Sequence, residues 1–253
     1  MIQLTEAQLL GWLTPVLWPF LRTLALFSAM PVLGTRTVPV RVRIGLAAFT
    51  SLAAQASLPE VAPVALDSAL AFVLVVQQVL IGVALGFAVR VVFAAVEFAG
   101  EIIGLQMGLN FAGFFDPLSA ATGTATSRFY GTTIAWLFIV VNGHLLVIAA
   151  LMQSFEAFPV GPEPFGFLKQ TQPHRWGGEI FALGLWLAMP LIAMLLFVNL
   201  VLGMISRVAS QINIFAVGFP ITLGVGLLGI LLTLPAMQQP FTVALERMLS
   251  FFR

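Results

Sequence analysis

The chain has 253 residues and a formal net charge of +1; 60% of its residues are hydrophobic and only 8% are charged. A soluble domain carries roughly 25% charged residues, so this composition excludes a soluble protein and predicts a membrane protein. The small net charge and scattered basic residues argue against a nucleic-acid partner. Because the sequence has no cysteine, disulfides, thiolate metal sites and a cysteine nucleophile are also excluded.

Apolar runs suited to membrane helices recur along the chain. A spanning helix needs about 20 mostly apolar residues. Prolines inside or beside most of the runs predict kinked or discontinuous helices. We therefore expect an all-α, multi-pass membrane protein of kinked helices and helical hairpins. The candidate spans are Leu9–Leu33, Ile44–Leu58, Ser68–Val89, Phe129–Phe155, Ile180–Ser206 and Val208–Leu245.

The segment Phe98–Ala120 is too apolar for a solvent loop and too rich in glycine for a lipid-spanning helix. Irregular backbone at membrane depth persists only where protein buries it or where it lines a cavity. Glycine hinges beside methionine and phenylalanine suit a loop that closes a passage. A re-entrant helix in the core, with a new helix starting at Asp116-Pro117, is equally compatible. The candidate gate residues are Gln106, Met107, Gly108, Phe111, Gly113, Phe114, Phe115 and Asp116.

Three charged residues lie before this segment or at its start, at helical spacing. Arg90, Glu97 and Glu101 fall on one face of a helix. Charges at membrane depth are costly and usually face a bundle interior or an aqueous cavity. They predict a charged seam that holds subunits together or lines a channel. An internal salt bridge near a helix end is the alternative.

Two polar stretches follow. Ser119–Ser127 consists of small residues, which let membrane helices approach closely, although a plain connecting loop is also compatible. A second polar cluster lies between two apolar runs and predicts a helical hairpin tip bonded to neighbouring subunits; a loop capped by its own side chains is the alternative. The residues of this tip are Arg207, Gln211, Asn213, Gly218 and Pro220.

Nothing in the sequence indicates catalysis. His144 and His174 lack a second metal ligand at a useful spacing, so we expect no metal site. No catalytic triad, phosphate-binding loop or nucleotide fingerprint is present. We therefore expect a protein that is not an enzyme and holds no cofactor.

Several short motifs follow one another in a fixed order: Pro31-x-x-Gly34, Val38-Pro39-x-Arg41-x-Arg43, Glu101-Ile-Ile-Gly104-x-Gln106-Met107-Gly108 and Arg207…Gln211-x-Asn213-Ile-Phe…Gly218-Phe-Pro220. This ordered set resembles the FliR family of flagellar biosynthesis proteins, part of the type III secretion export gate. The resemblance runs nearly end to end. One departure is Ser210, where the family commonly has proline before the glutamine.

The resemblance implies a fold, partners and a location. Residues 1–178 would be FliP-like, with the plug loop at about 105–125, and residues 179–253 would form a FliQ-like helical hairpin. With FliP and FliQ the protein would build a helical export gate in the bacterial inner membrane, at the flagellar basal body. The gate would contact FlhB and FlhA and would pass unfolded flagellar subunits. A six-span small-molecule transporter or permease is the alternative function.

Overall fold

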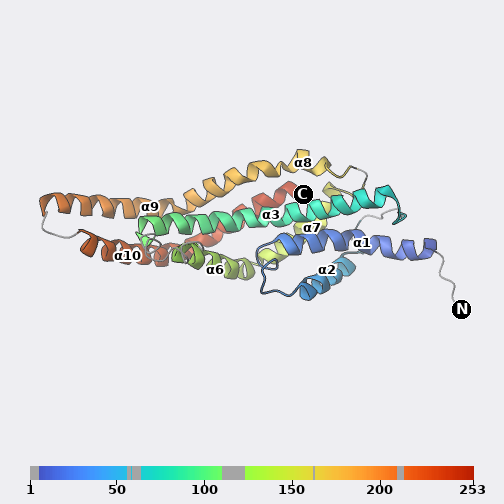
Figure 1. Ribbon diagram of the computed structural model, residues 1–253, viewed down its shortest axis with the longest axis horizontal. Helices are drawn as coiled ribbons and strands as arrows, with labels where there is room; N and C mark the ends of the chain where they lie inside the picture. The colour runs from blue at the N-terminus through green and yellow to red at the C-terminus, as the bar shows by residue number, and fades with distance from the viewer. Residues whose placement is uncertain (1–5, 56–57, 59–63, 110–122, 162, 210–213) are drawn as a thin grey trace. The chain divides into compact units, whose positions relative to one another are not determined.

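The computed structural model describes residues 6–55, 58, 64–109, 123–161, 163–209 and 214–253. Within these ranges the chain is helical and forms no strand. The helices are α1 Glu6–Ala29, α2 Val40–Ala54, α3 Ala69–Gln106, α6 Ala125–Val140, α7 Gly143–Ala157, α8 Gly166–Thr171, α9 Trp176–Val208, α10 Ile214–Thr233 and α11 Gln238–Leu249 (Figure 1). Short 3-10 turns η3 Pro173–Arg175, η4 Leu234–Met237 and η5 Ser250–Phe252 adjoin them.

Three stretches of the described chain are long and apolar enough to cross a membrane: Ala69–Gln106, Gly166–Val208 and Ala216–Phe252. A fourth is possible if α6 and α7 count as one span, since these helices are bent by 69° at the break between them. The first two of the six predicted spans give only shorter helices: the apolar part of α1 is Leu13–Ala29, and α2 has 15 residues. The protein is thus an all-α, multi-pass membrane protein with fewer full spans than predicted.

Four of the prolines lie inside continuous helices: Pro15 and Pro19 in α1, Pro190 in α9 and Pro220 in α10. Pro235 lies in the 3-10 turn η4, where the helix is interrupted between α10 and α11, as predicted. The 69° bend instead falls at Asn142, which has a left-handed backbone with φ of 56°. Asparagine tolerates this conformation better than most residues, so the bend is a turn set by asparagine.

The chain divides into two compact units that interleave in sequence. The first unit comprises Met1–Arg90, Asn142–Trp176 and Leu245–Arg253. In it, α1 packs on α2, and the C-terminal turn η5 packs on α7 and α8. Phe252 is fully buried, with its ring against those of Phe158 and Trp176. Aromatic edge-to-face contacts therefore fix the C-terminus in this unit.

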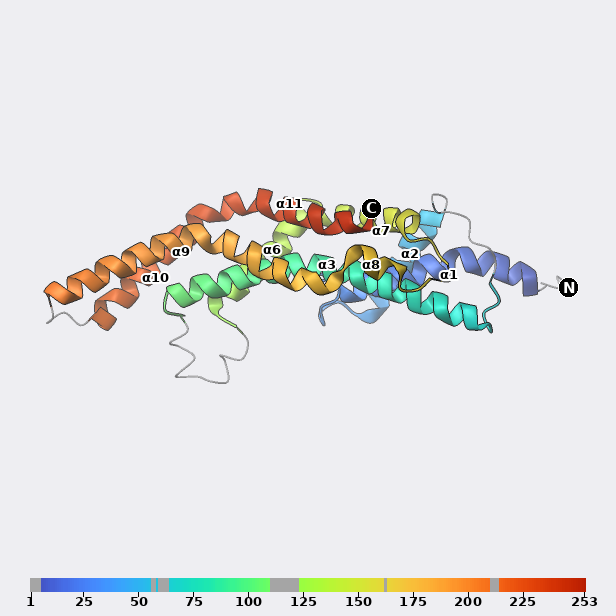
Figure 2. The same cartoon turned by 90° about the horizontal axis from the view of Figure 1, so that it is seen from above.

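The second unit comprises Val91–Val141 and Gly177–Ala244. Helices α9 and α10 lie side by side in it (Figures 1 and 2). A Cβ added at Gly229 of α10 would lie 2.5 Å from Cε of Met194 of α9, which shows that the two helices are in close contact. The C-terminal part of α3 packs on α9 through Gly184 and the rings of Phe98 and Phe181. Small residues thus allow three apolar helices to approach within this unit.

The predicted division near Gly178 concerns likeness to other folds and stays a prediction. The irregular segment was predicted to begin at Phe98, and this start is wrong. The chain remains helical through Gln106, so Gly100 and Gly104 are helix residues. Both glycines make room for close packing: the backbone of Thr126 and Ser127 lies against Gly100, and the side chains of Thr124 and Thr126 lie against Gly104.

Candidate functional site

The candidate site is the base of the loop that joins α3 to α6, in the second unit. The loop leaves the end of α3 at Met107, and the described chain resumes at Gly123. Gly108 has φ of 81° and Gly123 has φ of 83°, so a left-handed glycine stands at each end of this segment. Glycine is the residue that takes this backbone at no steric cost. Of the two glycines predicted as hinges, Gly108 lies in the turn after α3 and Gly113 lies outside the described residues, so their role as hinges stays a prediction.

Met107 fastens the start of the loop to α10. Its side chain is fully buried, and its backbone N–H donates to the carbonyl of Ile103 at 3.0 Å. The hydroxyl of Thr222 lies 3.4 Å from the carbonyl of Met107 and 3.1 Å from that of Phe219, and its single proton is shared between them. The side chain lies against Gly226, where an added Cβ would come within 2.5 Å of Met107 Cγ. The contact depends on the missing side chain at Gly226.

Glu101 fastens the other end of the loop to α3. Its Oε2 accepts hydrogen bonds from the backbone N–H of Thr124 at 3.1 Å and from the Thr124 hydroxyl at 2.9 Å. Thr124 is also the N-cap of α6 and accepts the backbone N–H of Ser127 at 3.1 Å. Hydrogen bonds to an ionised carboxylate are stronger than neutral ones, at about 1.5–3 kcal/mol. A charge-assisted pair therefore closes the loop at its exit.

Close helix packing surrounds this pair. A Cβ at Gly104 would overlap the Thr126 hydroxyl, and one at Gly100 would lie 2.9 Å from Cα of Ser127. Of the two readings of Ser119–Ser127, close helix approach is confirmed for the described residues from Thr124 onward. The sequence missed Gly123 and Thr124 as loop-end residues, although a threonine N-cap before an apolar run is a recognisable helix-start signal.

The structure describes three of the eight predicted gate residues. Gln106 ends α3, and Met107 and Gly108 form the turn that follows it. Phe111, Gly113, Phe114, Phe115 and Asp116 lie outside the described residues, and so does the helix start proposed at Asp116-Pro117. Their role as a plug stays a prediction.

The three residues of the predicted charged seam have different surroundings. Arg90 and Glu97 are exposed in the single chain, and Glu101 is half-buried. The carboxylate of Glu97 lies beside Gly131 of α6, where an added Cβ would be 3.1 Å from Oε1. The side chain of Glu101 on α3 thus contacts Thr124, where the loop ends. A seam between subunits through Arg90 and Glu97 stays a prediction.

The predicted hairpin tip is shorter than expected. Arg207 lies in the last turn of α9 and is exposed, whereas Gln211 and Asn213 lie outside the described residues. Gly218 and Pro220 belong to α10, so the break predicted at these residues is wrong. Pro220 is exposed on a helix that begins at Ile214, and the helix continues through it. The tip is confined to the few residues between α9 and α10.

A second polar cluster lies in the first unit around Arg22, whose side chain is fully buried. Nε donates to Gln78 Oε1 at 2.8 Å, Nη1 to the carbonyl and hydroxyl of Ser154 at 2.7 and 3.0 Å, and Nη2 to the carbonyl of Phe158 at 2.8 Å. The guanidinium also lies 3.8 Å from the ring centre of Phe155. Neutral oxygens and an aromatic face thus hold this charge. Its position at the end of α7 suits a cation, because the helix dipole is negative there.

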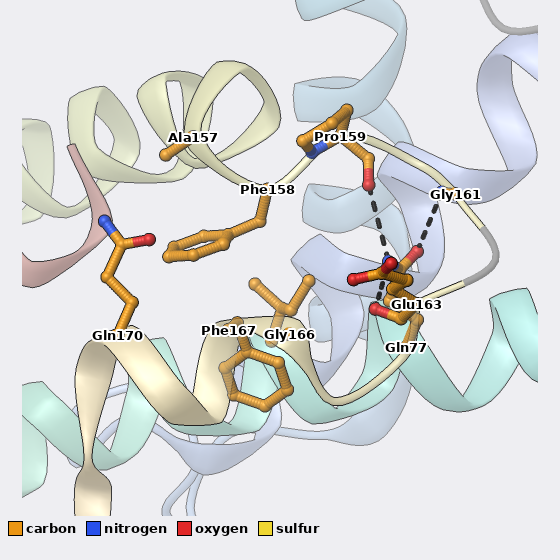
Figure 3. Close-up of a pocket in the computed structure, with 10 residues that line it drawn as sticks. Gln77, Ala157, Phe158, Pro159, Gly161, Glu163, Gly166, Phe167 and Gln170 are labelled. Atoms are coloured by element: carbon orange, nitrogen blue, oxygen red, sulfur yellow. Dashed lines mark hydrogen bonds between the residues drawn. The ribbon is translucent and has the colours of Figure 1, made fainter.

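Gln77 extends this network to a surface pocket of about 410 Å³. Its amide donates to the carbonyls of Pro159 and Glu163 at 3.4 and 3.2 Å and accepts the N–H of Gly161 at 3.2 Å (Figure 3). These bonds fix the backbone between α7 and α8. A signal for this cluster is present in the sequence, since Arg22, Gln77 and Gln78 are polar residues inside apolar runs and such residues usually pair with one another.

No cluster of metal-binding side chains occurs in the described part of the chain. His144 and His174 are both exposed there.

Comparison with known proteins gives one consistent result. Residues 13–248 match the model of the family described as bacterial export proteins, family 1. The flagellar biosynthetic protein FliR of Escherichia coli K12 is 47% identical over 230 residues, covering 90% of this chain and 87% of that protein. The FliR protein of Pectobacterium carotovorum is 42% identical over 236 residues, covering 93% and 90%. That of Bacillus subtilis is 28% identical over 240 residues, covering 90% and 91%. From its apolar helices and these matches, the chain belongs to the FliR family of flagellar biosynthetic export proteins.

Proposed function

We propose that this protein is a non-enzymatic pore component of the flagellar export gate. With FliP and FliQ it forms the entry channel for unfolded flagellar subunits across the bacterial inner membrane, and the gate contacts FlhB and FlhA. The loop between α3 and α6 closes the channel. Membership of the FliR family supports the export role. The observation that carries the closing role is the structure of the loop base. Hydrogen bonds at Met107 and at Thr124 hold the two ends of the loop, and each end has a glycine with a left-handed backbone.

The exposed apolar surface of the chain supports an assembly with other subunits. Large side chains on α9 and α10 are open in the single chain, including Phe197 at 67%, Leu232 at 77% and Val208 at 89% exposure. Helix α2 exposes Phe49 at 73% although it is too short to span a membrane. Contiguous apolar surface of this kind marks contact with lipid or with other proteins. Exposure on a helix as short as α2 favours protein partners over lipid.

The assembly is tested by expression with and without the neighbouring export proteins, followed by size analysis in detergent. We expect the chain to be degraded or aggregated when expressed alone and to co-purify with two other small hydrophobic proteins. A monodisperse, long-lived monomer would contradict the proposal. It would favour the small-molecule transporter, which needs no such partners.

The closing role is tested by removing Gly108–Phe114, or by replacing Phe111, Phe114 and Phe115 with serine. Each change removes apolar side chains from the loop, so we expect the purified assembly to conduct ions or small solutes when the wild-type assembly does not. Export continues, because the loop obstructs the path without driving transport. The control is Gly203→Ala on α9, where the added Cβ meets nothing within 4 Å and the loop is left intact. An intact complex as tight as wild type would rule out the closing role.

A further inference from the structure

Helix α2, in the first unit, is covered on one face only. It packs on α1, and its buried residues lie on one side of the helix: Ala47, Ser51 and Ala54. The opposite side carries large apolar residues three or four positions apart, which places them on one face of a helix. These residues, here called the α2 stripe, are Val42, Leu46, Phe49 and Leu52, and all four are exposed. A Cβ added at Gly45, beside the stripe, would meet nothing within 4 Å, so the described chain leaves this face open.

Three arginines gather at the N-terminal end of the α2 stripe. Arg36 precedes the helix, and Arg41 and Arg43 lie in its first turn. Arg43 Nη2 donates to the carbonyl of Val38 at 3.0 Å, which holds the turn after Arg36 against the helix. The first turn of α2 contains no acidic residue, and the positive end of the helix dipole lies there as well. One end of the stripe is therefore strongly positive.

The described part of the chain does not neutralise this charge. The sequence has no acidic residue between Glu6 and Glu60. Arg36 and Arg41 are exposed, and no described acidic side chain pairs with either of them. The described hydrogen bonds of the Arg43 guanidinium go to backbone carbonyls, which are neutral. Charge complementarity therefore indicates a partner that brings an anionic group to this end of α2.

Two kinds of anionic partner exist, a membrane surface and a protein. A helix that lies on a membrane surface keeps a polar face, rich in basic residues, in the water. Helix α2 has no such face, because the side opposite the stripe packs on α1 and its arginines lie only in the first turn. With 15 residues it is also too short to span a bilayer. These observations favour a protein partner.

We propose that α2 lies between α1 and a segment of a neighbouring protein of the assembly. This segment covers the α2 stripe with apolar side chains and places a carboxylate against Arg36 or Arg41. Arginine pairs with a carboxylate through two parallel hydrogen bonds, so the charged end fixes the direction of the segment. The inference deepens the proposed function, on which it rests for the existence of an assembly, by stating the chemistry of the partner and the face that it covers.

A zero-length cross-link tests for the carboxylate in the purified assembly. Lys169 is the one lysine of the sequence, so Arg41→Lys or Arg36→Lys places a single new amine at this end of α2. A water-soluble carbodiimide takes up the water released when an amine and a touching carboxylate form an amide bond. We expect at least one of the two variants to form this bond with an aspartate or glutamate of a neighbouring subunit, identified by mass spectrometry. Arg175→Lys, at another exposed position of the first unit, is the control and should not reach that carboxylate. No cross-link to another subunit from either variant would overturn the proposal.

A second substitution in the cross-linking variant tests the α2 stripe. Phe49→Ser removes the most exposed member of the stripe, which is 73% exposed, so the fold of the chain itself does not depend on this ring. We expect the cross-link yield to fall severalfold, because the apolar contact that holds the segment is lost. Phe72→Ser on α3 is the matched control, since Phe72 is 71% exposed and lies outside the stripe. Equal yields in the two variants would contradict a role for the stripe.

A fluorescence measurement distinguishes protein from lipid on the same face. The sequence has no cysteine, so Phe49→Cys gives the chain a single thiol for a fluorophore. The assembly is placed in phosphatidylglycerol vesicles whose acyl chains carry a nitroxide quencher. We expect no quenching, because protein covers this position; strong quenching would show that lipid covers it and would overturn the proposal.

The result is separable from the proposed function. If the neighbouring export proteins co-purify with the chain but neither lysine variant cross-links to them, the assembly stands and the docking face fails. If the loop deletion causes no leakage while the cross-link forms, the closing role fails and the docking face stands.

Discussion

In the first unit a fully buried arginine ties α1 to α3 and α7, and each of its four hydrogen bonds is 3.0 Å or shorter. In the second unit the loop base rests on glycines, a methionine and a threonine hydroxyl that shares its proton at 3.4 and 3.1 Å. The first arrangement has one allowed geometry, because moving any helix leaves a buried donor or acceptor unpaired. The second arrangement combines apolar packing of Met107, which has no angular requirement, with a few hydrogen bonds from Thr222 and to Glu101. The two units thus differ in how strongly directional hydrogen bonds fix their helices.

The largest expected effect comes from breaking the buried arginine cluster. Arg22→Ala would leave the oxygens of Gln78, Ser154 and Phe158 without their donor inside a buried space. We expect a loss of unfolding free energy on the order of 3–5 kcal/mol, measured by thermal unfolding of the detergent-purified assembly.

Arg22→Lys is the matched control, because it keeps the charge but cannot reach all three helices. It should lie between wild type and Arg22→Ala. Wild-type stability of Arg22→Ala would show that the buried network is dispensable, and the contrast between the units would collapse.

The next effect comes from enlarging the packed glycine beneath the loop exit. In Gly104→Ala the added Cβ overlaps the Thr126 hydroxyl and lies 3.1 Å from that of Thr124, so α6 must move away from α3. Overpacking of this kind costs about 1–3 kcal/mol. Gly203→Ala on α9 meets nothing within 4 Å and serves as control. Thermal unfolding of both variants measures the difference, and equal melting temperatures would contradict the observed packing.

A smaller effect is expected when the charge at the loop exit is removed. Glu101→Gln keeps an oxygen that can accept from Thr124 but loses the ionised acceptor. Neutral hydrogen bonds contribute about 0.5–1.5 kcal/mol, against about 1.5–3 kcal/mol for charged ones, so the loss should be about 1 kcal/mol. Thr124→Val removes the hydroxyl donor and the N-cap together and should cost more. Hydrogen exchange at the start of α6 measures both, and unchanged protection in Thr124→Val would exclude this pair as the exit fastening.

The smallest effect on the chain itself is expected at Arg90, which is exposed. Arg90→Ala should change the stability of the single chain by no more than about 0.5 kcal/mol, as surface substitutions do. If a partner covers Arg90, as the predicted seam requires, assembly should fall sharply in Arg90→Ala and in Glu97→Ala. Co-purification yield separates these results. Normal assembly and export in both variants would leave the seam without a role.

Much of the candidate site was accessible from the sequence. The run from Glu101 to Gly108 was identified because charge, glycine and methionine occur together in an apolar context, and the loop does leave its helix at Met107. Its start was placed too early, since Gly100 and Gly104 are poor helix formers in isolation. Close packing against Thr124 and Thr126 overrides that preference. Helix α10 likewise continues through Gly218 and Pro220, where the sequence predicted a break.

The sequence by itself determined the class of protein and the absence of cysteine chemistry, and its ordered motifs carried the resemblance to the FliR family. These properties are local, and each can be read from a short stretch of residues. Only the tertiary structure decided that Arg22 pairs with Ser154, 132 residues away, and that Met107 rests on α10. Such pairings depend on which helix faces approach one another. One-dimensional hydropathy cannot show this for helices such as α3, α9 and α10, which are apolar over most of their length.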